Sequence, residues 1–169
     1  MKNITKILAL AFVAFAFSTS VNAQSTASAS ASATIISPIS ITKTVDLDFG
    51  NVAASGLAGT VVITPAGSRS TTGGVSLPVI TGTVTAASFD VTGQANYTYA
   101  ITLPASVTLS SGANNMTVDA FTSNPATTGT LSGTGTQTLN VGATLNVGAS
   151  QAAGIYTSGT PFDVTVNYN

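Results

Sequence analysis

Residues 136–149 read TQTLNVGATLNVGA and contain the same five residues twice, at 139–143 and at 145–149. The copies start six residues apart, an even number, so an extended strand turns the same side chains of both copies to the same face. The duplication is not continued along the rest of the chain, which argues against a solenoid. We therefore expect one long strand with a single apolar face, formed by Leu139, Val141, Ala143, Leu145 and Val147.

The same two-residue alternation of apolar and polar side chains recurs on both sides of this strand. The alternating runs lie at 39–49, 75–79, 89–91, 97–103, 107–109, 116–120 and 162–168. They are rich in the Val, Ile, Thr and Tyr that a pleated surface favours. Turn residues separate them, at Gly73-Gly74, Ser111 to Asn114, Asn124-Pro125 and Gly133 to Gly135. This pattern predicts an all-β protein without helices: an immunoglobulin-like antiparallel β-sandwich of about 7–9 strands.

The N-terminus has the layout of a secretory signal peptide, which we assign to residues 1–23. Lys2 and Lys6 precede an apolar run at 7–17, and Val21-Asn22-Ala23 offers small side chains at the cleavage positions. The apolar run is about half as long as the roughly 20 residues of a membrane-spanning helix. We expect export to the periplasm, cell surface or extracellular space, and not an integral membrane protein.

Charge is scarce in the remaining chain. Beyond residue 23 the chain has two cationic residues, Lys43 and Arg69, and five Asp, which gives a net charge of 2 − 5 = −3. The whole chain has no Glu, His, Cys or Trp. The usual general bases, thiol nucleophiles and zinc ligands are therefore missing, so we expect no enzyme and no cofactor. Nucleic-acid binding needs clustered cations, so it is not expected either.

Asp46 and Asp48 are the only residues that suggest a metal. They lie on one face of a predicted strand and carry the oxygen ligands that a hard cation prefers. No Asp-rich loop completes such a site, so we expect no metal and interpret the pair as a solvated outer face.

An alternating arm follows the signal peptide. Residues 24–34 are rich in Ala and Ser, which predicts a flexible arm before a single sandwich domain at 35–169. The apolar positions of the arm share one register with the first predicted strand. Main-chain hydrogen bonds and alternate side chains are what a β-augmenting strand provides. The candidate donor residues are Ala27, Ala29, Ala31, Ala33, Ile35, Ile39 and Ile41.

The C-terminus carries a resemblance to known families. Gly154-Ile155-Tyr156, followed by Phe162 to Asn169, resembles the last strand of chaperone–usher pilus subunits and of spore-coat-U-like secreted proteins. The pattern of 39–51, 96–103 and 144–169 is similar to a bacterial secreted family, domain of unknown function 4402.

The pilus resemblance implies an incomplete sandwich. In such subunits a periplasmic chaperone, and then the N-terminal arm of the next subunit, supplies the missing strand. Carried over to this chain, the resemblance makes the last strand the acceptor, with the residues Phe162, Val164, Val166 and Tyr168.

Two functions follow from these expectations. The first is a non-catalytic secreted or surface structural protein, a pilin-like subunit that self-assembles by β-strand donation. The second is a monomeric extracellular binding or adhesive module, in which the last strand closes a complete sandwich.

Overall fold

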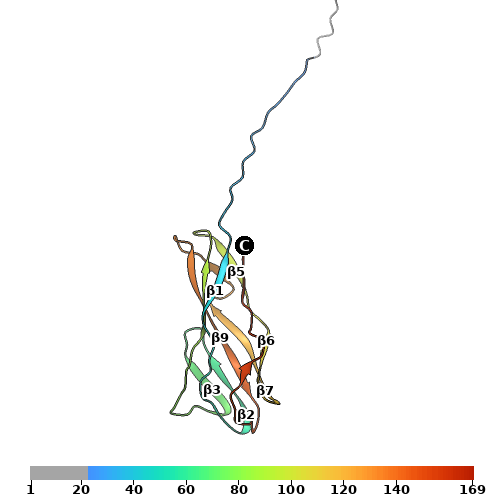
Figure 1. The fold of residues 1–169 in the computed structure, drawn as a ribbon. Coiled ribbons are helices and arrows are strands. Elements are labelled where there is room, and N and C mark those ends of the chain that lie inside the picture. The colour runs from blue at the N-terminus through green and yellow to red at the C-terminus, as the bar shows by residue number, and fades with distance from the viewer. Residues whose placement is uncertain (1–22) are drawn as a thin grey trace, which may run out of the picture. The chain divides into compact units, whose positions relative to one another are not determined.

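The structure is a computed structural model of the chain and describes residues 23–169. The predicted signal peptide lies outside these residues except for Ala23. Residues 24–34, the predicted arm, belong to no strand, and their side chains are exposed. Ile35–Asn169 form one compact unit (Figure 1).

This unit is built from antiparallel strands, and residues 23–169 contain no helix. The predicted all-β sandwich is thus confirmed. The number of strands exceeds the expected 7–9. β8 and β10 are too short to show an alternation in the sequence, and β2 shows none in its first half. The strands are β1 (Ser40–Val45), β2 (Ala53–Ile63), β3 (Arg69–Ser76), β4 (Ala87–Thr92), β5 (Thr98–Thr102), β6 (Ser106–Ser111), β7 (Asn114–Asn124), β8 (Thr128–Thr130), β9 (Thr136–Val147), β10 (Thr157–Ser158) and β11 (Thr165–Tyr168).

The strands form two sheets. The larger sheet has the order β1-β4-β9-β7-β6-β10, with β2 also paired to β9 and β3 to β2, and the smaller has the order β11-β5-β8. The strand β9 runs through the middle of the unit (Figure 1). One edge of β9 pairs first with β4 and then with β2, while its other edge pairs with β7.

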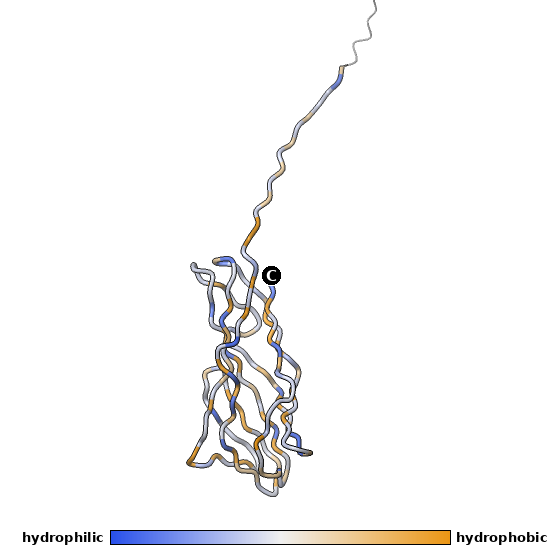
Figure 2. The backbone as a smooth tube through the Cα atoms, viewed as in Figure 1, coloured by the Kyte–Doolittle hydropathy of each residue, from blue (hydrophilic) through white to orange (hydrophobic). Residues whose placement is uncertain are grey.

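The predicted apolar face of β9 is buried along its whole length, as expected from the duplicated sequence. It contributes to two hydrophobic clusters, and Figure 2 shows apolar residues spread along the unit. The β2–β3 cluster consists of Phe49, Val61, Ile63, Val75, Val118, Ala143, Leu145 and Val147. The β4–β5 cluster consists of Ala87, Phe89, Val91, Tyr99, Leu131, Leu139, Val141 and Val166.

The region of β2 and β3 differs from the expectation. Gly73-Gly74 is not a turn but lies inside β3, and the predicted strand at 75–79 ends at Ser76. Val79 is fully exposed beyond it. The glycines let two backbones approach closely, since a Cβ on Gly74 would collide with the carbonyl oxygen of Leu57. Glycine thus serves close strand packing here rather than chain reversal.

Candidate strand-acceptor edge

The last strand, β11, is the edge of the smaller sheet. Within residues 23–169 it pairs with β5 alone. The backbone N–H of Asn169 donates to the carbonyl of Thr98 over 3.4 Å, so odd-numbered residues of this strand face β5. Val166 and Tyr168 therefore turn their backbone N–H and C=O groups to the unpaired side. Such a row of free donors and acceptors is a template for another strand.

The four predicted acceptor residues all pack against the β4–β5 cluster, but they do not form one strand. Val166 is 7% exposed and Tyr168 is half-buried, and both lie in β11. Phe162 and Val164 precede the strand, and the Phe162 ring lies 5.0 Å from that of Phe121. The segment that pairs with β5, Thr165–Tyr168, is therefore shorter than the predicted alternating run at 162–168.

The Tyr168 hydroxyl ties the last strand to the beginning of the compact unit. It accepts a hydrogen bond from the backbone N–H of Gln94 (2.6 Å) and donates one to the carbonyl of Ser37 (2.8 Å). The N–H of Ser37 in turn donates to Oε1 of Gln94 over 3.2 Å. The sequence marked Tyr168 as a strand residue, but its partners are set by tertiary contacts that no local pattern reveals.

The first strand, β1, is one of the edge strands of the larger sheet and lies close to β11. It carries the last two predicted donor residues, Ile39 just before it and Ile41 within it, and both pack against the β4–β5 cluster. These two residues therefore belong to the domain's own core. Ile35 is 97% exposed, and Ala27, Ala29, Ala31 and Ala33 lie in the arm outside the strands. The structure therefore divides the predicted donor segment after Ile35.

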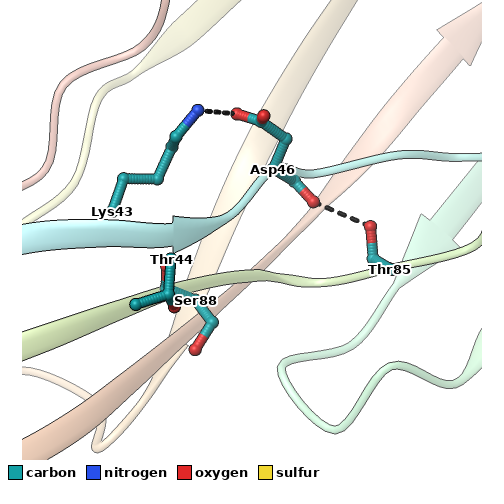
Figure 3. Close-up of polar contacts among 5 residues, drawn as sticks. All are labelled: Lys43, Thr44, Asp46, Thr85 and Ser88. Atoms are coloured by element: carbon teal, nitrogen blue, oxygen red, sulfur yellow. Dashed lines mark hydrogen bonds and ion pairs between the residues drawn. The ribbon is translucent and has the colours of Figure 1, made fainter.

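The edge of β1 carries charge that β11 lacks. Nζ of Lys43 lies 2.6 Å from Oδ1 of Asp46 (Figure 3). The Thr85 hydroxyl donates to the Asp46 carbonyl over 2.7 Å, and that of Thr44 donates to the Ser88 carbonyl over 3.0 Å. The pairing of β1 with β4 also shifts between Lys43 and Val45. A lysine and a bulge protect an edge strand from pairing, so β11 is the more accessible of the two edges.

The two aspartates that the sequence suggested as metal ligands contact different partners. Asp46 is paired with Lys43, and the carboxylate of Asp48 accepts the N–H of Gly50 over 2.8 Å. Among residues 23–169 no group of three potential metal ligands comes together. The same part of the chain holds no helix with the length and apolarity needed to cross a membrane.

Tyr99 anchors the smaller sheet in the core. It is fully buried, and its hydroxyl donates to Oε1 of Gln137 over 2.8 Å. The same oxygen accepts the N–H of Thr130 in β8 over 2.9 Å. Desolvation by burial raises the pKa of Tyr99 above its ordinary value. Its hydroxyl thus joins β5 of the smaller sheet to β9 of the larger one.

The fold defines an all-β sandwich domain whose last strand, β11, is an edge strand without charged side chains. The chain belongs to the family described as Domain of unknown function (DUF4402), whose model matches residues 39–168. The match covers all eleven strands and leaves the Ala/Ser arm outside. No curated protein and no solved structure matched the chain.

Proposed function

We propose that this protein is a non-catalytic, exported structural subunit that assembles by β-strand donation at the cell surface or outside the cell. The observation that carries the proposal is the free edge of β11. It offers backbone groups beside a hydrophobic cluster and carries no charged side chain from Thr165 to Asn169.

The arm suits the role of donor. The small side chains of Ala27, Ala29, Ala31 and Ala33 share one face of an extended segment, and Ile35 adds a single large apolar group that is 97% exposed. A second copy of the chain is the simplest source of such a strand. A periplasmic chaperone using the same edge before assembly is part of this proposal, in line with the resemblance of the last strand to pilus subunits.

The alternative proposal is a monomeric binding or adhesive module. The burial of Val166 supports it, because this residue of the edge strand is 7% exposed without any donated strand. The Tyr168 hydroxyl, which holds β11 against the start of the unit, supports it too.

Sedimentation velocity of the exported protein, with its arm at residues 24–34 intact, separates these two functions. We expect concentration-dependent oligomers for the intact protein and monomers after deletion of residues 24–34. Ile35→Asp should also prevent assembly, because it places a charge on the apolar face of the donor. Ser32→Asp is the matched control, since it puts the same charge on the opposite face. Strand donation is wrong if the intact protein is monomeric at every concentration, or if the deletion leaves assembly unchanged.

A further inference from the structure

β11 pairs with β5 and β10 pairs with β6, and the two antiparallel pairings continue the same residue register. Thr165 in β11 pairs with Thr102 in β5, and Ser158 in β10 pairs with Leu109 in β6. The unpaired residues 159–164 lie opposite residues 103–108, an equal number on each side. The two short pairings are thus the ends of one antiparallel ribbon that is open in its middle. We call these two opposed segments the ribbon window.

Two prolines account for the opening. The odd-numbered residues of the last strand face β5, so the same alternation makes Asp163 and Pro161 the residues that would exchange hydrogen bonds with Pro104 and Ser106. Proline has no backbone N–H. Each of these two adjoining pairs therefore lacks one donor, and the ribbon does not close between its paired ends.

An open surface pocket of about 550 Å³ lies along the ribbon window. Exposed Ser106, Thr108 and Asp163 line it, and the half-buried Val107 and Phe162 contribute apolar surface. Its volume falls within the range of about 300–1,000 Å³ that is usual for small-ligand sites. Because strand pairs close both ends, a compact ligand fits this shape better than a strand that runs through it.

The lining also limits the chemistry of the ligand. Among residues 23–169, Asp163 is the only charged residue that lines this pocket, which disfavours an anion, and one carboxylate is too few for a hard cation. In the described part of the chain, its carboxylate makes no hydrogen bond or ion pair that would compete with a ligand. The hydroxyls of Ser106, Thr108 and Thr160 both donate and accept hydrogen bonds. Backbone groups without a strand partner add further donors and acceptors.

From this combination we propose that the ribbon window binds one residue of a neutral saccharide. The carboxylate of Asp163 accepts hydrogen bonds from sugar hydroxyls, the Ser and Thr hydroxyls complete the polar contacts, and Phe162 with the prolines contacts the C–H face. The window lies on the β5-facing side of the last strand, so its ligand and a donor strand on the free edge use opposite sides of that strand.

Amide NMR titration of the full chain tests the site, with glucose, galactose, mannose, N-acetylglucosamine and their short oligosaccharides as probes. We expect saturable shifts confined to residues 103–108 and 159–164 for at least one sugar. Asp163→Asn should weaken its binding roughly tenfold or more, since hydrogen bonds to a charged group are strong. Asp90→Asn, which removes an exposed carboxylate from β4, is the control and should leave binding unchanged.

A second variant closes the ribbon window without touching Asp163. Pro104→Thr combined with Pro161→Thr restores both missing N–H groups, so the ribbon should pair throughout. We expect slow amide exchange at 103–108 and loss of sugar binding in a protein that remains folded. The proposal is overturned if no sugar of the panel shifts these amides, if Asp163→Asn binds as well as the parent, or if the closed ribbon still binds.

Discussion

Replacing Tyr168 by Phe removes the hydroxyl that joins the last strand to the start of the compact unit and keeps the ring in the β4–β5 cluster. Two hydrogen bonds are lost, one from the Gln94 N–H (2.6 Å) and one to the Ser37 carbonyl (2.8 Å). At about 0.5–1.5 kcal/mol each, the unfolding free energy should fall by about 1–3 kcal/mol. For a domain of this size each kcal/mol corresponds to roughly 3–5 °C in Tm.

Chemical denaturation measures this loss, and hydrogen exchange locates it. We expect faster exchange at Ser37 and Gln94, because both amides belong to the broken network. Tyr97→Phe is the matched control: its ring packs edge-on against Tyr168 at 5.7 Å, and within residues 23–169 its hydroxyl makes no hydrogen bond. If both variants lose the same stability to within about 0.5 kcal/mol, the Tyr168 hydroxyl does not hold the two ends together.

Two further predictions concern the core. Burial raises the pKa of Tyr99, so above a pH of about 10 the unfolded chain loses this proton before the folded domain does, and stability falls as pH rises. Tyr99→Phe should flatten this alkaline decrease in denaturation curves; an unchanged slope in Tyr99→Phe would contradict the assignment. In the duplicated sequence, Gly142→Ala brings a Cβ against the Ile63 carbonyl and should cost about 1–3 kcal/mol. Gly148→Ala meets only the end of a flexible side chain and should cost clearly less in the same assay, so equal losses would show that the two glycines are equivalent.

The sequence predicted best those elements whose burial follows a simple alternation. β9 is the clearest case, since each apolar residue from Leu139 to Val147 is buried. The turn at Ser111 to Asn114 also appears as expected, as the connection between β6 and β7. In both places, local side-chain pattern and tertiary environment agree, so a period of two is enough to identify the strand.

The elements that were missed depend on contacts between distant segments. β2 contains Gly56 and Gly59, and Leu57 is the one large apolar side chain in its first half, so it shows no alternation there. Gly59 and the glycines of β3 instead allow the two backbones to come together. The run at 75–79 shows the reverse case, with alternation interrupted by Pro78 and no buried partner for Val79.

The candidate sites show the same division. The alternation drew attention to the last strand, and its apolar residues do pack against the core. Which side of that strand is unpaired depends on its neighbours. The ribbon window depends on matching two prolines that are 57 residues apart in sequence (161 − 104), and their relation is visible only when the register of the strands is known.

The position of β9 has a consequence for how the domain unfolds. Two hydrophobic clusters that share no strand can unfold in successive steps. Here the same strand supplies Leu139 and Val141 to one cluster and Ala143, Leu145 and Val147 to the other. Releasing β9 exposes both clusters at once, so neither half has a stable partly folded form. The two clusters should melt in a single cooperative transition, with equal van't Hoff and calorimetric enthalpies.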